Sequence, residues 1–206
     1  PFNSKSLADN KTLSLFEDRS GMMWAGTASR GVDRMSPNPE KFKSYILQPG
    51  KLKSLCENDI TCAREDSKGN LWIGSKSGLM YFDRRTNTFK CFRHNESQSN
   101  SLTDNRIYAI DIDSLDHIWV GTNEGLNYYN PETDKWTVYK YYEKNIDGLP
   151  GKIVMDVIVR SNGKIWAATN GMICALKSKS GIFENQFNNS NIAKHKRAFY
   201  CTLFED

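Results

Sequence analysis

Short apolar runs separated by turn-forming polar residues recur along the whole chain. Within residues 60–94 the runs ITCARED, NLWIGS, GLMYFD and TFKCFRH predict consecutive β-strands at 60–66, 70–75, 78–83 and 88–94. The stretch DSKGN between the first two predicts a tight turn, because Asp66 can accept hydrogen bonds from the following backbone and Gly69 can adopt a positive φ. Helical periodicity of useful length is absent from the sequence, which therefore predicts an all-β fold.

The same pattern occurs four times, so the chain is a repeat protein. Each copy is centred on a tryptophan, with successive spacings of 48, 47 and 47 residues: Trp24, Trp72, Trp119 and Trp166. A small residue follows two positions later, namely Gly26, Gly74, Gly121 and Ala168. A hydroxyl residue comes next, namely Thr27, Ser75, Thr122 and Thr169.

The turn between the first two strands also recurs, as DRSGM, DSLDH and RSNGK in the other copies. Asp116 replaces the glycine in the third copy, and aspartate tolerates a positive φ better than most residues. Every copy therefore has the turn chemistry that a hairpin at this position requires.

Tandem units of four antiparallel strands are typical of β-propeller blades. We expect four blades, at about 12–47, 60–94, 107–142 and 153–188. A blade has neighbours on both faces, so we interpret the tryptophans as wedges between sheets and the glycines as positions of close approach. A role for the tryptophans in stacking on an aromatic ligand is the alternative.

The two ends of the sequence match internal parts of the repeat. Residues 3–18 resemble the linker and first strand at 96–113, and 199–206 match the first strand of a fifth, incomplete blade. We therefore expect a segment of a larger propeller, whose open blade faces favour self-association. Two copies would supply eight blades.

Composition and charge exclude some classes of protein. A hydrophobic content of 38% with 25% charged residues is typical of a globular chain, and no window approaches the 18 apolar residues of a membrane span. The net charge of +4 is spread along the sequence, with its densest cluster, AKHKRAF, at 193–199. We interpret that cluster as a solvated loop, and we expect no nucleic-acid partner.

Cysteine and histidine spacing predicts no metal site. The five cysteines are an odd number without a CxxC motif, and most lie in strand-like apolar runs, where a free cysteine behaves as a small hydrophobe. We therefore do not expect a disulfide framework. The three histidines are scattered, and DIDSLD (111–116) lacks the glycine and the distal glutamate of a calcium loop.

Paired carboxylates recur once per repeat, at Glu17/Asp18, Glu65/Asp66 and Asp111/Asp113. Catalytic carboxylates need different environments, whereas residues that recur at one strand end are more often turn caps. The sequence has no nucleophile elbow or P-loop, and no helix follows GTNEG or GSKSG to bind a phosphate. We expect no catalytic residues, no cofactor and no metal.

The candidate binding surface is the end of each blade that carries the loop after the second strand. These loops differ among repeats (TASRG, SKSG, TNEG and TNG), and the linker 139–152 is long and aromatic. Amides and charges can bind sugar hydroxyls while tyrosines stack on sugar faces. The candidate ligand-binding residues are Arg30, Lys76, Asn123, Glu124, Asn170, Tyr141 and Tyr142. Ordinary solvated loop residues are the alternative interpretation.

Three stretches carry a resemblance to a known family: DSKGNLWIGSKSGLMYFD, DHIWVGTNEGLNYYNPETDKW and SGMMWAGTASRGVDRM. They resemble the two-component regulator propeller repeat, and the resemblance extends over about residues 3–206. The fourth repeat departs from it, with AAT for GT and GMICALK in the third strand.

The resemblance implies the periplasmic sensor region of a hybrid two-component system of Bacteroides-type bacteria. In such systems the propeller is linked to an immunoglobulin-like module, a transmembrane helix, a histidine kinase and a response regulator, and the signals are oligosaccharides released from glycans. Phosphotransfer and membrane attachment would then belong to parts absent from this chain.

Three functions remain open at this stage. A sensor segment would bind an oligosaccharide and shift the arrangement of two sensor regions, changing kinase output. A scaffold would support dimerisation without binding a ligand. A carbohydrate-active enzyme is the third alternative. Function inferred from fold analogy alone is associational, so the site residues must decide.

Overall fold

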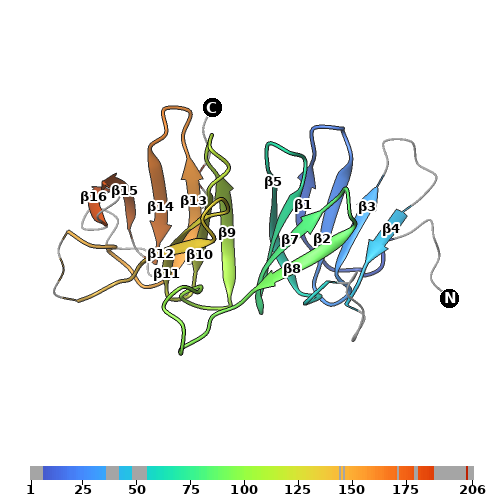
Figure 1. The fold of residues 1–206 in the computed structure, drawn as a ribbon, viewed down its shortest axis with the longest axis horizontal. Coiled ribbons are helices and arrows are strands. Elements are labelled where there is room, and N and C mark those ends of the chain that lie inside the picture. Colours follow the sequence, from blue (N-terminus) through green and yellow to red (C-terminus); the bar gives the residue numbers. More distant parts are fainter. Residues whose placement is uncertain are drawn as a thin grey trace, which may run out of the picture. The chain divides into compact units, whose positions relative to one another are not determined.

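The structure, a computed structural model, describes residues 7–35, 42–47, 55–143, 145, 147–170, 172–178, 181–187 and 203. Within these ranges the chain is all-β. Sixteen strands form four separate four-stranded sheets, and each sheet is an antiparallel meander in chain order (Figure 1). This is the predicted fold class, with one sheet for each repeat.

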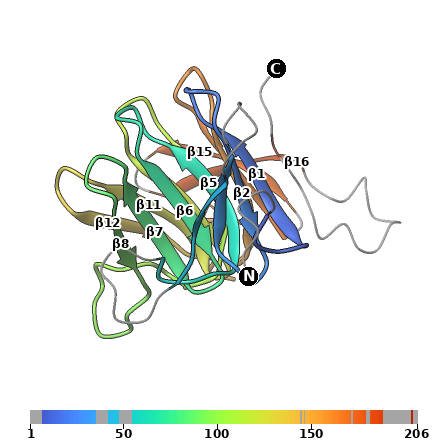
Figure 2. The same ribbon diagram turned by 90° about the vertical axis from the view of Figure 1, so that its right-hand side faces the viewer.

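The sheets are called blades 1 to 4. Blade 1 contains β1 (Thr12–Glu17), β2 (Met23–Thr27), β3 (Val32–Met35) and β4 (Phe42–Tyr45). Blade 2 contains β5 (Ile60–Glu65), β6 (Leu71–Ser75), β7 (Gly78–Asp83) and β8 (Thr88–Phe92). In Figure 2, β6, β7 and β8 lie side by side in this order.

Blade 3 contains β9 (Ile107–Ile112), β10 (Ile118–Thr122), β11 (Gly125–Asn130) and β12 (Lys135–Tyr139). Blade 4 contains β13 (Val154–Val159), β14 (Ile165–Thr169), β15 (Ile173–Ser178) and β16 (Ile182–Phe187). The expected fifth-blade strand at 199–206 lies outside the described residues except for Leu203, and the basic cluster at 193–199 lies outside them entirely.

The second strands are largely buried because blade 1 packs against blade 2 and blade 3 packs against blade 4. Every residue of β6 and of β10 is buried, whereas the residues of the outer strands β8 and β12 are exposed or half-buried, apart from the buried Tyr139 at the end of β12. The continuous run LWIG thus marks the interior of a blade and the alternating run KWTVY marks its outer edge.

The chain divides into two compact units. The first comprises residues 1–93 with 105–107, and the second comprises 94–104 with 108–206. In the first unit, Trp24 of β2 is 2% exposed and contacts Tyr45 and Phe82 at ring-centroid distances of 5.9 and 6.3 Å. Because Phe82 belongs to blade 2, Trp24 lies in the core between the two sheets.

The second unit repeats this arrangement with blades 3 and 4. Trp119 of β10 is 3% exposed and stacks on Tyr139 at 6.2 Å, and Tyr139 contacts Phe183 of β16 at 5.7 Å. Trp72 is equally buried against Tyr81 and Phe92 of its own blade. Trp166 of blade 4 is half-buried.

The glycine after each buried tryptophan allows the next blade to approach. A Cβ atom added to Gly26 would lie 2.8 Å from Ile60 Cγ2, and one added to Gly121 would lie 2.7 Å from the Val154 carbonyl oxygen. Ile60 and Val154 begin the first strands of blades 2 and 4. Both contacts are shorter than a real Cβ tolerates, so glycine is required there for packing.

A second recurring contact joins the linker that enters a blade to the third strand of that blade. The Ala8 N–H donates to Asp33 Oδ2 at 2.7 Å, and the Thr103 N–H donates to Asn127 Oδ1 at 2.8 Å. In blade 2 the Cys56 N–H occupies the same place and donates to Met80 Sδ at 3.4 Å.

Blade 4 lacks both partners of this bond. The linker residue is Pro150, which has no N–H, and the third-strand residue is Cys174, whose Sγ–H instead donates to the Ala167 carbonyl at 3.5 Å. Blade 4 therefore has neither the linker N–H nor the third-strand acceptor. No polar group is left without a partner by the loss of this bond.

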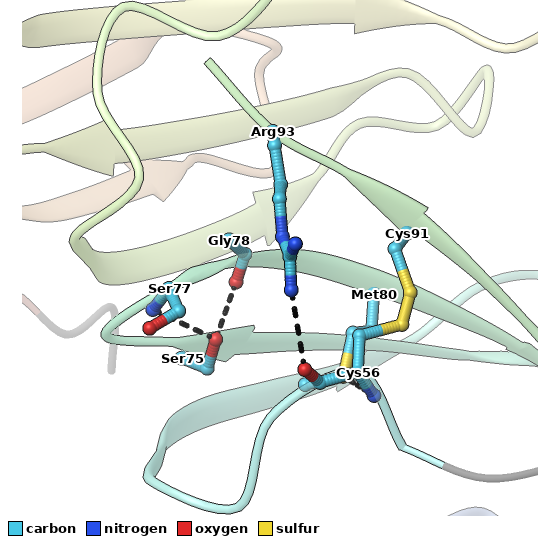
Figure 3. Close-up of a disulfide and its surroundings, with 7 residues drawn as sticks. All are labelled: Cys56, Ser75, Ser77, Gly78, Met80, Cys91 and Arg93. Carbon is cyan, nitrogen blue, oxygen red and sulfur yellow. Dashed lines mark hydrogen bonds between the residues drawn. A yellow bond between two sulfur atoms is a disulfide. The ribbon is translucent and has the colours of Figure 1, made fainter. Parts of the chain in front are cut away.

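One expectation from the sequence was wrong. Cys56 and Cys91 form a disulfide with a Cα–Cα distance of 6.3 Å (Figure 3). Cys62 and Cys174 are not part of a disulfide. The two cysteines of the disulfide are 35 residues apart in the sequence, so their pairing could not be predicted from local spacing. The linker before β5 folds back over Met80, and Met80 pairs directly with Cys91 in the β7–β8 ladder, so the two cysteines become neighbours.

Candidate functional site

Each blade has two different ends. The tight turns between the first and second strands form what we call the turn end. The loops between the second and third strands, together with the linker that enters the blade, form the loop end. Both were candidates for function, through the paired carboxylates and the variable loops respectively.

At the turn end, the aspartates that recur in blades 1, 2 and 3 cap their turns. Oδ1 of Asp18, Asp66 and Asp113 accepts the N–H of the residue two positions later and the N–H four positions later, at 2.9–3.1 Å. The glycines and Asp116 in these turns have positive φ, with a value of 60° at Asp116. These carboxylates therefore have structural partners, and the turn-cap interpretation describes their geometry.

Asp18 has additional partners. Trp24 Nε1 donates to its Oδ2 at 2.8 Å, and Arg84 Nη2 from blade 2 lies 2.7 Å from the same oxygen. Burial opposes ionisation of Asp18, but the hydrogen bonds from Ser20, Trp24 and Met22 and the Arg84 charge outweigh it and hold the pKa of Asp18 well below its usual range. Arg84 also lies over the Trp24 ring, 5.0 Å from the centroid. The group joins blades 1 and 2.

At the loop end a side-chain hydroxyl closes each loop. The hydroxyls of Thr27, Ser75, Thr122 and Thr169 each donate to the carbonyl near the start of the third strand, at 2.8–3.0 Å. This explains the hydroxyl residue that follows the small residue in every repeat. The loop backbone is thereby held in place while its other side chains remain variable.

The loop after the second strand also bonds to the linker before the first strand. The N–H groups of Ala28, Lys76 and Asn170 donate to the carbonyls of Lys11, Asp59 and Ile153, at 3.0–3.2 Å. Loop and linker therefore form one surface at the loop end of these blades.

In the first unit the loop end carries Arg30 and Lys76, both exposed. Lys76 Nζ forms an ion pair with Asp59 at 2.7 Å, and the Arg30 N–H donates to Thr27 Oγ1 at 3.1 Å. Asp9, on the linker into blade 1, accepts from Ser29 Oγ at 2.6 Å. Lys76 is thus held beside a carboxylate.

In the second unit Glu124 pairs with Lys152 of the next linker at 2.7 Å. Asn170 Oδ1 accepts the Ile153 N–H at 3.2 Å, so the linker residues 152–153 connect Glu124 with Asn170. Asn123, next to Glu124, is half-buried. Three of the candidate residues therefore lie on loops that meet one short linker segment.

The two candidate tyrosines lie elsewhere on the same linker. Tyr141 and Tyr142 are 41% and 61% exposed. The chain after them meets the outermost strand of blade 4, where the Phe183 N–H donates to the Asp147 carbonyl at 2.7 Å. Within the described part of the unit, no hydrogen bond, ion pair or ring contact joins either tyrosine to Glu124 or Asn170.

Sequence reasoning missed the linker partners Asp59 and Lys152. Asp59 and Ile153 occupy the same place in the repeat, directly before the first strand, where the carbonyl receives the loop N–H. Aligning the linkers as well as the strands would have placed Asp59 beside Lys76 and Lys152 one position away from the Asn170 contact.

The remaining local features are modest. Ser75, Ser77, Met80 and Arg93 lie around the disulfide, and the space between them is too small for a small-molecule ligand (Figure 3). No group of three or more potential metal ligands occurs among the described residues. Within the same ranges, no helix is long and apolar enough to cross a membrane.

Two stretches of the chain match the family model of the two component regulator propeller, at residues 54–77 and 101–124. Each match covers the linker, the first two strands and the following loop of one blade, ending at the loop residues next to Lys76 and at Glu124. No curated protein matches this chain in sequence.

Solved structures share the fold. The chain is similar to the extracellular domain of a protein described as the hybrid two component system BT3049 from B. thetaiotaomicron, with 22% identity and a TM-score of 0.76, covering 91% of this chain and 26% of that one. The corresponding domain of BT4673 from the same organism is 21% identical with a TM-score of 0.68, and the match covers 82% of this chain and 22% of that one. This chain thus spans about a quarter of each.

A propeller enzyme is also similar. Virginiamycin B lyase from Staphylococcus aureus has 14% identity and a TM-score of 0.65, with 85% of this chain and 55% of that chain covered. At these identities the likeness shows the fold alone, whereas the family model identifies the repeat. Two stretches of the chain thus match the two component regulator propeller family, and the described residues fold as blades of a β-propeller.

Proposed function

We propose that this chain is a non-enzymatic, ligand-sensing segment of the extracytoplasmic propeller of a hybrid two-component receptor, and that its ligands are glycan-derived oligosaccharides. The receptor would lie in the inner membrane, with this segment in the periplasm. Kinase and phosphorelay steps would reside in other parts of the receptor. Ligand binding would change the arrangement of two sensor regions and so change kinase output.

One observation carries this proposal. The loop end keeps its backbone constant while its side chains change from blade to blade, and the two stretches that match the family model include this end of blades 2 and 3 together with the opposite turns. Equivalent loop positions carry Arg30, Lys76, Glu124 and Asn170 on a backbone closed each time by a hydroxyl. A constant frame with variable polar groups suits recognition, because the frame preorganises the groups that select the ligand.

The turn end supports the non-enzymatic part of the proposal. Its carboxylates already accept two or more backbone hydrogen bonds each, which leaves them poorly placed to move protons on a substrate. The fold is shared with virginiamycin B lyase, so this part rests on the side chains and not on the fold.

A thermal-shift screen tests the proposal. A ligand that binds only the folded chain raises its Tm by mass action, and 100 Kd of ligand adds about 2.7 kcal/mol. We expect one class of oligosaccharide to stabilise the chain, with the shift reduced in Lys76→Ala or in Glu124→Ala. Arg85→Ala, which removes an exposed cation at the opposite end of blade 2, is the matched control and should keep the shift. If no class raises the Tm of the folded chain, ligand sensing by this segment is wrong.

The second candidate is a dimerisation scaffold, and an exposed apolar pair on β1 favours it. Leu13 and Leu15 are 40% and 65% exposed. We propose that these exposed leucines promote self-association of two copies. Light scattering should then give a mass near twice 23.5 kDa, and Leu15→Lys should lower it. A monomer at high concentration would exclude the scaffold.

A further inference from the structure

The linker segment 55–59 is attached to blade 2 by three kinds of contact. Leu55 is 1% exposed and belongs to the core between blades 1 and 2. The Cys56 N–H donates to Met80 Sδ at 3.4 Å, and Arg93 Nη2 donates to the Cys56 carbonyl at 3.3 Å (Figure 3). These polar contacts are weak, because a thioether is a poor acceptor and the arginine is exposed.

The same segment fixes the loop end of the first unit. The Gly31 N–H donates to the Asn58 carbonyl at 3.0 Å, and the Leu47 N–H donates to Asn58 Oδ1 at 2.7 Å. Asp59 receives the Lys76 N–H and pairs with Lys76 Nζ. The loops of both blades 1 and 2 therefore depend on where residues 55–59 lie.

The disulfide is the covalent attachment of this segment. It joins Cys56, within the linker, to Cys91 on the outermost strand β8 (Figure 3). Cys91 is exposed and Cys56 is half-buried, so dissolved thiols and disulfides can reach the pair in the folded chain.

In blade 3 the corresponding linker residue is attached to its blade by hydrogen bonds instead of a disulfide. Thr103 occupies the position of Cys56, and Val138 occupies that of Cys91. Thr103 donates its N–H to Asn127 Oδ1 at 2.8 Å, and its hydroxyl bonds to Asn127 Nδ2 and to Thr122 Oγ1, both at 2.8 Å. Blade 2 has the disulfide where blade 3 has three short hydrogen bonds.

We propose that the Cys56–Cys91 disulfide is a redox-sensitive staple that holds segment 55–59 on blade 2 and thereby fixes the loop end of the first unit. The staple acts whatever ligand the loop end binds, so it does not rest on the proposed sensor function. In the reduced chain only non-covalent contacts hold the segment, namely the packing of Leu55, its hydrogen bonds and the Asp59–Lys76 ion pair, and the loops that depend on it open more often.

The staple forms by thiol–disulfide exchange with an external disulfide, R–S–S–R. The thiolate of exposed Cys91 attacks one sulfur, which forms a mixed disulfide and releases one thiolate of R. The Cys56 thiolate then attacks the Cys91 sulfur, which forms the Cys56–Cys91 bond and releases the second thiolate. The two cysteines lose two protons and two electrons, and R–S–S–R becomes two R–SH. An oxidising compartment supplies such disulfides.

Hydrogen exchange measured by mass spectrometry on the oxidised and the reduced chain tests the staple. Reduction should speed exchange of the Gly31 and Lys76 amides by about 10-fold or more, because the loop they depend on loses its cross-link. The Asn170 amide makes the equivalent bond to Ile153 in blade 4, without a disulfide, and should change less than about 2-fold.

Two variants separate the staple from other thiols. Cys91→Ser should show the fast exchange of the reduced chain in the absence of reductant, and reductant should have no further effect. Cys62→Ser removes a thiol of the same unit that is not part of a disulfide and should behave as the unmodified chain. Peptide mapping of the unmodified chain should recover a Cys56–Cys91-linked peptide after exposure to a glutathione redox pair.

Three results would overturn the proposal, and all three are measured on the unmodified chain. They are the absence of the linked peptide, unchanged exchange at Gly31 and Lys76 on reduction, and equal acceleration at Asn170. The last would show a loss of global stability instead of a local release.

Discussion

Replacing Asp33 by asparagine should stabilise the chain. Asp33 is fully buried in β3, where its Oδ2 accepts the Ala8 N–H and its Oδ1 has no hydrogen-bond partner. Asn127 occupies the same position in blade 3, paired with Val120 as Asp33 is with Ala25. There the amide nitrogen donates to the Val120 carbonyl at 3.3 Å. An asparagine at 33 would keep the accepting oxygen and present its N–H₂ to the Ala25 carbonyl.

The magnitude follows from the unsatisfied oxygen. A buried polar atom without a partner costs about 1–3 kcal/mol, and a new hydrogen bond contributes about 1 kcal/mol. We therefore expect Asp33→Asn to raise the free energy of unfolding by about 1–3 kcal/mol. The reciprocal change, Asn127→Asp, removes the donor that satisfies Val120 and should lower it by a similar amount or more.

Urea unfolding followed by tryptophan fluorescence measures both variants against the unmodified chain. The midpoint should rise for Asp33→Asn and fall for Asn127→Asp at unchanged slope, since neither change alters the surface exposed on unfolding. The equivalence of the two positions is refuted if Asp33→Asn is destabilising, or if Asn127→Asp is as stable as the parent.

Three further changes test the packing and the turn end. Gly121→Ala should cost about 1–3 kcal/mol in urea unfolding, because the new methyl would meet the Val154 carbonyl of the next blade; an unchanged midpoint would contradict the close approach. Arg84→Met should cost about 3 kcal/mol or more by leaving the fully buried Asp18 side chain without its counter-charge, whereas the exposed Arg85→Met should change stability by less than about 0.5 kcal/mol. Because the pKa of Asp18 is lower in the folded chain, its stabilisation is complete above the unfolded value of about 3.9 and is lost as the pH falls below it. Asp18→Asn should therefore be less stable at pH 7 and lose less stability on acidification, as thermal melts across that pH range would show.

Local signals in the sequence predicted the blades because each signal has one structural cause. The Asp and Gly of the turns, the tryptophan with the glycine two positions later, and the closing hydroxyl all act within a blade or on the next one. Even the exchange of glycine for Asp116 kept the positive φ that the turn needs. Because these requirements are short-range, the residues that meet them recur in each repeat and can be recognised in the sequence.

Contacts that differ from blade to blade were not visible in the same way. The Cys56–Cys91 disulfide, the Asp59–Lys76 pair and the Glu124–Lys152 pair do not recur in the other described blades. Each involves a linker, and the strand pattern does not predict the path of a linker. Linkers vary in length and composition, so their side-chain partners depend on tertiary packing. The two tyrosines lie on a linker whose Asp147 carbonyl accepts the Phe183 N–H of β16, a contact that the strand pattern does not predict either.

The joint replacement at Pro150 and Cys174 shows how the repeat tolerates variation. A proline at the linker position removes the N–H donor and would leave a third-strand acceptor without a hydrogen bond. In blade 4, however, the third-strand residue is a cysteine whose thiol bonds to another group. Two positions 24 residues apart therefore change together for a physical reason. Comparing the four linkers with the four third strands reveals such pairs without any structure.

Hydrogen exchange of the folded chain, with and without a pool of neutral and acidic oligosaccharides, tests most directly whether the loop end is the binding surface. We predict slower exchange in the loops after β2, β6, β10 or β14 and in their linkers, and no change in the turns that Asp18, Asp66 and Asp113 cap. Protection confined to those turns, or no protection anywhere in a chain shown to be folded, would contradict a ligand-sensing loop end.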